Sequence, residues 1–468
     1  MVQGLDKSER ARRRQAAASL VAAPPAVDLT AVALTWVDTS GITRTKAVPF
    51  KRLEEAAEWG VGMSPVFDAF LVDDSIVSGR YAGGPIGDLR LHPDLERLVP
   101  LAAMPGWAWA PAERFTQEGT EHSLDARWLL SREVARLAAR DLQVLTAFEV
   151  EWAVSKGDGE DFVPACTGPA YGMTRIAELS DYLRDVMRAL EGSRVSVVQI
   201  HPEYAAGQYE LSVAHEDPVG AADTLVLVRE TIRAVSFRYG LSASFSPKVL
   251  ADSVGNGTHV HLSLWHRDSP EKRSNLMAGG DGPCGMTGQG EAFTAGILEH
   301  LPALLAVGAP SVASYMRLIP SHWAGAFACW GLENREAALR FVQGPLGRRD
   351  QAANLEVKCF DGAANPYLAL AALLAAGHAG LEAGTVLPDP VNDVDPAMLD
   401  ADEREARGIR ALPASLEESV AAFEADAVLR EAFGEAVIDT VAVVRRGEIA
   451  LFAGATPERI AAAVRRRH

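Results

Sequence analysis

The pattern of apolar and polar positions divides the chain near residue 122 into two parts. In the first part, residues 27–50 hold two β-rich runs on either side of the turn Asp38–Gly41, which predicts a β-hairpin. In the second part, residues 125–141 repeat apolar positions at the 3.6-residue spacing of a helix. The sequence therefore predicts a small β-rich unit followed by a larger unit in which helices and strands are mixed.

The larger unit alternates helices and strands along its length. After the helix at 125–141, the pattern predicts a β-run at 144–154, a helix at 180–190, a β-run at 195–200, a helix at 221–239 and a strand at 259–265. The first 20 residues are polar and basic, and we expect a flexible arm there, which is either mobile or helical. The expected organisation is an arm at 1–20, an N-terminal domain at 21–122 and a second domain at 123–468, with an α+β fold overall.

Composition narrows the class of protein. The chain has 468 residues, of which 48% are hydrophobic and 23% charged, as in soluble globular proteins, and this excludes a disordered or fibrous chain. The formal net charge of −17 repels phosphate backbones, so no nucleic-acid partner is expected. The four cysteines lie far apart, which favours a reducing compartment. Without a signal-peptide pattern or a bilayer-length apolar stretch, we expect a cytoplasmic protein with no membrane partner.

Two carboxylates stand out in the β-run at 144–154. Glu149 and Glu151 are two residues apart, so they share one face of a strand, and their apolar neighbours indicate burial. Adjacent buried carboxylates are costly unless cations neutralise them. The alternative for this pair alone is that the face is simply solvated.

Further acidic and imidazole side chains lie on other strand-like segments. A segment at 201–210 adds Glu203 and Glu210, and an apolar run at 354–360 contains Glu356. A glycine-rich turn leads into a strand with three polar residues on one face, namely His259, His261 and Ser263. Together these groups predict a site for hard divalent cations, Mg²⁺ or Mn²⁺.

A set of arginines points to phosphate chemistry. Arg317, Arg335 and Arg340 carry planar guanidinium groups that suit carboxylates and phosphates, although each arginine alone is typical of a surface ion pair. Enzymes that transfer phosphoryl groups use divalent metals together with arginines to stabilise the charge of the phosphate oxygens. No Walker A sequence is present, so a P-loop enzyme is excluded.

Several blocks, taken in order, make the sequence resemble the glutamine synthetase superfamily from about residue 27 to the C-terminus. They are Glu149-Val150-Glu151, Glu203 with Gly207-Gln208-Tyr209-Glu210, Phe245-Ser246-Pro247-Lys248, Asn256-Gly257-Thr258-His259-Val260-His261, Arg317-Leu318-Ile319-Pro320, Trp330-Gly331-Leu332-Glu333-Asn334-Arg335 and Asn365-Pro366-Tyr367-Leu368. The resemblance implies a small N-terminal β-grasp domain and a large α/β catalytic domain. It also implies a homo-oligomeric ring, commonly a dodecamer, with each active site between neighbouring subunits.

The resemblance also implies a set of residue roles. One metal would be held by Glu151, Glu203 and Glu210, and the other by Glu149, His259 and Glu356. Glutamate would bind at Arg317, Gly255 and Lys358, while His261, Ser263, Arg335 and Arg340 would face ATP, with Arg317 and Arg335 acting in catalysis. The implied reaction uses ATP as co-substrate and two or more Mg²⁺ or Mn²⁺ ions. It phosphorylates the γ-carboxylate of L-glutamate, and an amine then attacks the γ-glutamyl phosphate.

The sequence departs from glutamine synthetases where ammonium would bind. The glutamate expected six residues after Arg317 is Trp323, and the ammonium-binding aspartate of the N-terminal domain falls at Ser64, with Asp68 as the nearby acid. Without these carboxylates the electrostatic attraction for a small cation such as ammonium is weaker. An aromatic side chain at this position instead suits an organic amine. The pattern resembles the γ-glutamyl-amine ligase branch.

A mono-amine such as ethanolamine is the favoured substrate. The alternatives are a polyamine ligase, an ammonia-using glutamine synthetase and a non-catalytic paralogue that binds glutamate or nucleotide. Lys358 and Asn354 replace two arginines of the family pattern, which favours the last alternative mildly. The loop 393–401 has no tyrosine, so adenylylation control is not expected.

Overall fold

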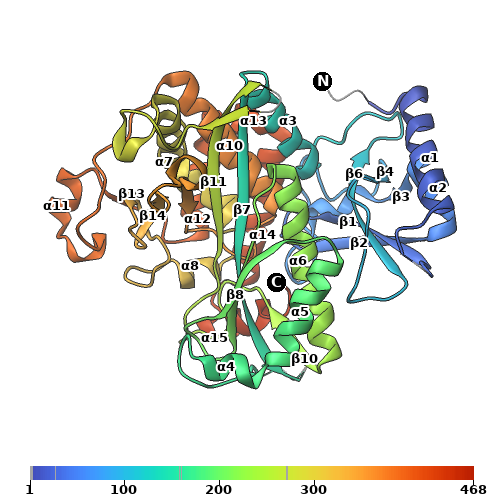
Figure 1. Cartoon of the computed structure of the whole chain (residues 1–468), viewed down its shortest axis with the longest axis horizontal. Coiled ribbons are helices and arrows are strands. Elements are labelled where there is room, and N and C mark those ends of the chain that lie inside the picture. The colour runs from blue at the N-terminus through green and yellow to red at the C-terminus, as the bar shows by residue number, and fades with distance from the viewer. Residues whose placement is uncertain (1–3, 27, 158, 160, 270–271) are drawn as a thin grey trace.

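The computed structural model describes residues 4–26, 28–157, 159, 161–269 and 272–468. The chain forms two β-sheets, one near the N-terminus and one at the centre of the molecule (Figure 1). The N-terminal unit, blue in Figure 1, lies beside the larger unit, whose long strands run through its middle. The change in sequence pattern near residue 122 falls between β6, which ends at Phe115, and α3, which begins at Ala126.

The N-terminal sheet has the order β2-β1-β6-β4-β3, with β5 paired to β6. Its strands are β1 (Ala31–Val37), β2 (Thr43–Pro49), β3 (Val61–Met63), β4 (Leu89–Pro93), β5 (Val99–Pro100) and β6 (Trp107–Phe115). Strands β1 and β2 are antiparallel, which confirms the expected hairpin, whereas β1 and β6 are parallel. A helix, α2 (Leu53–Trp59), leads from the hairpin towards β3.

The polar N-terminal segment is a helix, which is one of the two forms expected for this arm, and it packs against the N-terminal unit. Helix α1 (Lys7–Ala22) begins at Asp6, whose carboxylate accepts a hydrogen bond from the Glu9 N–H at 2.8 Å. The helix packs against α2, and Arg13 forms an ion pair with Glu113 of β6 at 2.7 Å. Residues 7–22 are therefore attached to the N-terminal unit, and residues 1–3 lie outside the described part of the chain.

The large sheet has the order β16-β13-β14-β15-β11-β7-β9-β8, with β10 paired to β7 and β12 paired to β11. Its strands are β7 (Leu142–Lys156), β8 (Val197–Pro202), β9 (Gln208–Val213), β10 (Leu241–Ser244), β11 (Thr258–Ser269), β12 (Lys272–Asn275), β13 (Phe327–Leu332), β14 (Ala337–Val342), β15 (Asn354–Val357) and β16 (Arg410–Ala411). Apart from the parallel pair β13 and β14, the neighbouring strands are antiparallel. The expected β-runs at 144–154, 195–200 and 259–265 are confirmed within a residue or two at most ends.

Helices flank the large sheet and carry most of the apolar core. They are α3 (Ala126–Ala138), α4 (Met173–Glu178), α5 (Ser180–Gly192), α6 (Pro218–Arg238), α7 (Gly288–Gly308), α8 (Ser314–Arg317), α9 (Arg349–Ala352), α10 (Pro366–Ala383), α11 (Ala401–Ala406), α12 (Leu416–Ala425), α13 (Ala427–Phe433), α14 (Glu435–Leu451) and α15 (Pro457–Val464). The predicted helices at 125–141, 180–190 and 221–239 correspond to α3, α5 and α6.

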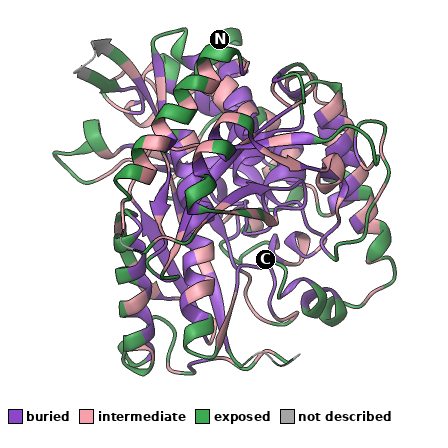
Figure 2. Ribbon diagram, turned by 90° about the vertical axis from the view of Figure 1, so that its right-hand side faces the viewer, coloured by how far each residue is buried: buried purple, intermediate pink, exposed green. Residues whose placement is uncertain are grey.

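Two of these helices, α7 and α10, pack closely enough to need glycine at their crossing. A Cβ on Gly296 of α7 would lie 2.3 Å from the Ala376 carbonyl oxygen of α10. Figure 2 shows the buried residues concentrated in the interior of the molecule, and residues of both helices belong to the main hydrophobic core. None of the described helices has the length and apolar character needed to cross a membrane.

Candidate active site

Strand register brings the predicted metal ligands together on one region of the large sheet. Glu149 of β7 lies directly opposite His259 of β11, and Glu151 of β7 lies opposite Glu210 of β9. On the far side of β11, Glu356 of β15 pairs with His261 and with Arg340 of β14. Because alternate residues share a face, the two carboxylates of β7 point to the same side as these partners.

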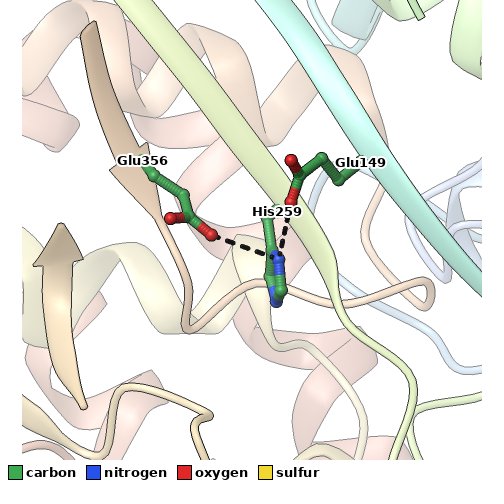
Figure 3. A group of neighbouring side chains, drawn as sticks. All are labelled: Glu149, His259 and Glu356. Atoms are coloured by element: carbon green, nitrogen blue, oxygen red, sulfur yellow. Dashed lines mark hydrogen bonds and ion pairs between the residues drawn. The ribbon is translucent and has the colours of Figure 1, made fainter. Parts of the chain in front are cut away.

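Glu149, His259 and Glu356 converge from three neighbouring strands (Figure 3). The Nδ1 atom of His259 lies 3.3 Å from a carboxylate oxygen of Glu149 and 3.3 Å from one of Glu356. The three ligand atoms lie within 4.8 Å of one another, so a divalent cation could bind all three. This is one of the two ligand sets that the resemblance implies.

The second ligand set is shared between two overlapping groups. Glu151, Glu210 and His259 offer three ligand atoms within 4.8 Å, and so do His201, Glu203 and Glu210. His201 was not among the predicted ligands, yet its Nε2 lies 3.1 Å from Glu210 and its Nδ1 lies 3.5 Å from Glu203. Glu210 therefore stands between the predicted partners Glu151 and Glu203.

The electrostatics of these carboxylates match a site built for cations. Burial, together with the charges of neighbouring glutamates, raises the pKa of Glu203 and of Glu210. Burial also acts on Glu149, but hydrogen bonds with His259 and His261 outweigh it and lower the pKa of Glu149. The cluster is thus only partly neutralised by histidine, and bound cations would relieve the remaining repulsion.

The carboxylates form one wall of a cavity of about 780 Å³. The predicted site residues that line it are Glu149, Glu151, Glu203, Glu210, Gly255, His259, Arg317, Trp323, Arg335, Arg340 and Lys358. Glu356 lies behind His259 and is almost fully buried. A cavity of this size is in the range of small-ligand sites.

Two basic side chains of the cavity are held by Glu356. Lys358 Nζ lies 3.1 Å from one Glu356 oxygen, and Arg340 Nη1 lies 3.0 Å from the other. Burial opposes ionisation, but the charge of Lys358 and the neighbouring histidines lower the pKa of Glu356 to about 2. Lys358, for which a role in glutamate binding is expected, thus neutralises a predicted metal ligand. Arg335 lines the cavity and forms no ion pair with the residues that the structure describes.

The two residues predicted to face ATP from β11 do not line this cavity. His261 lies 2.8 Å from the Asn354 side-chain oxygen through Nδ1 and 3.3 Å from Glu149 through Nε2. Ser263 accepts a hydrogen bond from the Trp265 indole at 2.8 Å. Both side chains lie farther along the strand, beyond His259.

The two residues predicted to replace the ammonium-binding acids lie in different parts of the chain. Trp323, with 59% of its surface exposed, lines the cavity. Ser64 precedes the short helix η2 (Pro65–Ala69) of the N-terminal unit and does not line the cavity of this chain. The nearby acid Asp68 is buried and accepts two hydrogen bonds from Arg114 at 2.8 Å, so its charge is already matched.

The structure adds cavity residues that sequence reasoning missed. Tyr171 donates a hydrogen bond to Glu203 at 2.9 Å, and Gln208 donates to the Gly255 carbonyl oxygen at 3.0 Å. Lys248 also lines the cavity. Gln208 and Lys248 belong to the sequence blocks that carry the resemblance, so the sequence could have indicated a place in the site for them. No sequence pattern indicated that Tyr171 or His201 would lie in the cavity.

Comparison with known proteins identifies the family. The profile described as "Glutamine synthetase, catalytic domain" matches residues 123–461. The chain therefore belongs to the glutamine synthetase family and is a ligase of that type, as the motifs predicted. The mixed fold of helices and sheets agrees with the fold of that family.

Particular relatives show where in the family the chain lies. The gamma-glutamylpolyamine synthetase GlnA3 of Streptomyces coelicolor is 56% identical over 437 residues, which cover 93% of this chain and 92% of the relative. A glutamine synthetase of Mycobacterium tuberculosis is 32% identical, over 88% of this chain and 90% of the relative.

Solved structures agree with the sequence relatives. A crystal structure of a novel glutamine synthase homolog superposes with a TM-score of 0.83 at 33% identity, covering 94% of this chain and 99% of that chain. A complex of GmaS with ADP superposes with a TM-score of 0.80 at 29% identity, covering 93% and 97%.

Proposed function

We propose that this protein joins an organic amine to the γ-carboxylate of L-glutamate, using ATP and passing through a γ-glutamyl phosphate. The observation that carries the proposal is the meeting of five predicted metal ligands with arginines at a single cavity, with the sixth ligand, Glu356, buried beside His259. Such an arrangement suits a reaction in which negative charge builds on a transferring phosphoryl group. The family assignment makes glutamate the expected acceptor.

The ligand set fits Mg²⁺ or Mn²⁺, with two or more ions in each site. Glu149, His259 and Glu356 would hold one ion, and Glu151, Glu203 and Glu210 would hold another. Five carboxylates and one imidazole form an oxygen-dominated set, which hard divalent cations prefer. When bound, the ions would neutralise the phosphate oxygens and the carboxylate wall.

The chain's own basic residues would position the reactants. Arg335 and Arg340 line the cavity and would bind the phosphate oxygens of ATP, because a guanidinium presents paired donors in a plane. Arg317 and the backbone of Gly255 would bind glutamate on another side. Holding the γ-carboxylate against the terminal phosphate would favour its phosphorylation, and the amine would then displace phosphate.

A polyamine is the amine that the comparisons support best. Trp323 supplies an apolar face instead of a carboxylate, which favours an alkyl chain over ammonium. Tyr171 and Tyr204 add exposed aromatic rings beside Glu203, so a long amine would meet both apolar surface and negative charge. The 56% identical relative named for polyamines points the same way. Ethanolamine, the amine favoured from sequence, remains the second candidate because Trp323 suits it equally.

The active enzyme is proposed to be a homo-oligomer, with a dodecamer as the expected form. Ser64 lies outside the cavity of its own chain. A neighbouring subunit could bring the same N-terminal segment to the cavity, as the family resemblance implies.

Phosphate release tests the proposed function. The assay contains ATP, Mg²⁺ and L-glutamate with ammonium, ethanolamine, methylamine, isopropylamine, putrescine, spermidine, spermine or aniline, and mass spectrometry identifies the product. Turnover with a polyamine and little with ammonium supports the proposal, and turnover with ethanolamine alone selects the second candidate. Turnover with ammonium alone, or no turnover with any amine while ATP binds, contradicts it.

A further inference from the structure

One corner of the cavity holds two positive side chains, neither of which forms an ion pair among the described residues. Lys248, in the loop after β10, and Arg317, at the end of α8, both line the cavity and are only 4% and 5% exposed. Two other cations of the cavity, Lys358 and Arg340, form ion pairs with Glu356. This corner, formed by Lys248, Gly255 and Arg317, is called the basic corner below.

Neither cation of the basic corner forms an ion pair with a carboxylate among the described residues, although the buried Asp361 interacts electrostatically with Arg317. In the part of the chain that the structure describes, no carboxylate lies within 4.0 Å of the Lys248 ammonium, and the Nη1 group of Arg317 is buried without a hydrogen-bond partner. The Nη2 group of Arg317 donates to the Lys358 carbonyl oxygen at 3.0 Å, which satisfies a donor but supplies no charge. Burial and the charge of Arg317 lower the pKa of Lys248, against the weaker effect of Asp252.

Backbone packing fixes the two side chains on either side of Gly255. A Cβ on Gly255 would lie 2.3 Å from the Pro247 carbonyl oxygen and 2.7 Å from the Cγ atom of Arg317. The Asn256 N–H also donates to the Pro247 carbonyl at 3.1 Å. The segment that carries Lys248 is therefore held against the loop that covers Arg317, and the two cations face the same space.

Two buried like charges repel each other, and leaving a guanidinium donor unsatisfied costs further free energy. A bound carboxylate would relieve both costs, because it can accept from Arg317 and pair with Lys248 at once. The γ-carboxylate of glutamate must lie against the metal-ligand wall to be phosphorylated, which leaves the α-carboxylate for the opposite end of the molecule.

We propose that Lys248 binds the α-carboxylate of the amino-acid substrate together with Arg317, and so selects substrates that carry this second carboxylate. This inference rests on the proposed function, since it names a contact of the glutamate substrate. It assigns a role to a residue for which neither the motifs nor the comparisons give one.

Kinetics with two carboxylic acids test the assignment. 4-Aminobutyrate retains a carboxylate that can be phosphorylated but lacks the second carboxylate of glutamate. In the wild-type enzyme we expect a strong preference for glutamate. In K248M and K248Q the KM for glutamate should rise roughly 10- to 100-fold, as loss of a charge-assisted contact implies. The KM values for ATP and the amine should change less than about twofold, and the preference for glutamate over 4-aminobutyrate should fall by a similar factor.

Further variants separate binding from folding. K248R keeps the charge and should recover part of the affinity for glutamate, and K51M, at an exposed lysine outside the cavity, is the matched control. K248Q nearly preserves side-chain length and polarity, so it remains informative if K248M fails to fold. An equal loss of kcat/KM with glutamate and 4-aminobutyrate in K248Q would overturn the assignment.

Binding measurements keep the assignment independent of turnover. Calorimetric titration of glutamate into the wild-type protein and K248Q, each with MgADP, should show affinity weakened roughly 10-fold or more in the variant. A wild-type enzyme that binds glutamate but turns over no amine would contradict the proposed function and leave the Lys248 assignment standing. Equal glutamate affinity in the two proteins would contradict the assignment alone.

Discussion

The backbone N–H of Trp323 donates a hydrogen bond to the Glu336 carboxylate at 2.7 Å. Glu336 immediately precedes β14 and is 6% exposed, so a buried acid anchors the loop that presents the indole to the cavity. Trp323 has a φ of 54°, and Ser321 in the same loop has a φ of 59°. Non-glycine residues rarely adopt this left-handed conformation, so the loop needs such contacts to hold its shape.

Removal of this anchor should weaken amine binding. In E336A the Trp323 N–H loses its acceptor, and we expect the KM for the amine to rise about 10-fold, as loss of a hydrogen bond to a charged group implies. In E336Q the side-chain oxygen can still accept, so the KM should stay within about threefold of wild type. Initial rates measured against amine, glutamate and ATP check this. A uniform rise in all three KM values would indicate general disruption instead.

A carboxylate at position 323 should admit ammonium. W323E places negative charge where the indole now lines the cavity, and a small cation then gains a partner. We expect the ratio of kcat/KM for ammonium to that for the best organic amine to rise at least about 10-fold. W323F keeps an aromatic wall and serves as the matched control. An unchanged ratio in W323E would show that Trp323 does not decide between the two substrates.

The local pattern of apolar and polar residues was enough to predict many helices and strands, but it could not predict which strands pair with one another. The hairpin of β1 and β2 and the helices α3, α5 and α6 follow from spacing and turn residues close together in sequence. The pairing of Glu149 with His259 joins residues 110 positions apart and depends on the order of the whole sheet. The family resemblance named these ligands, but spacing alone left open whether Glu149 faced solvent.

Helix α1 and the residues Lys248 and Glu336 show why other features were missed. The α1 sequence is polar, and the contact of Arg13 with Glu113 lies 100 positions away, so nothing local indicated attachment. The role of a charged residue depends on which groups neutralise its charge, and those groups are known only from the structure. Lys248 is notable because it forms no ion pair with the described residues around it, and Glu336 because it accepts from the Trp323 backbone. Neither fact can be read from the sequence.

Repulsion within the acidic cluster should lower the melting temperature of the metal-free protein. Burial and the charges of Glu149 and Glu151 raise the pKa of Glu210, so its ionised form is disfavoured in the metal-free protein. E210Q removes one charge and keeps an oxygen for the contact with His201. In EDTA we expect E210Q to melt about 1–3 °C higher than wild type, whereas Mg²⁺ should stabilise the wild type more than the variant.

Scanning calorimetry with EDTA and with Mg²⁺ measures both effects of E210Q. The matched control is E405Q, which removes one charge from an exposed position on α11. This control should show the same response to Mg²⁺ as the wild type. An E210Q protein that gains as much from Mg²⁺ as the wild type would contradict a role for Glu210 in holding the metal.

A buried histidine in the N-terminal unit should make the protein sensitive to acid. His92 of β4 is 2% exposed, and its Nδ1 lies 3.1 Å from the Ala57 carbonyl oxygen. Burial, aided by nearby arginines, lowers the pKa of His92 to about 4 from an ordinary value of 6.5. The unfolded chain therefore binds a proton between pH 6.5 and 4 that the folded chain does not.

The sign of this linkage follows from the lowered pKa. The stability linked to His92 is fully present above pH 6.5 and is lost as the pH falls towards 4, by roughly 3 kcal/mol over the whole interval.

In H92N the amide can still donate to Ala57, but nothing titrates there. The wild type should be the more stable protein at pH 7, and its advantage over H92N should shrink as the pH is lowered, which melting temperatures at half-unit steps can follow. The matched control is H215N, at an exposed histidine. A difference between wild type and H92N that stays constant from pH 7 to pH 4.5 would mean that His92 takes up its proton without unfolding, and that burial of its ring does not oppose the charge.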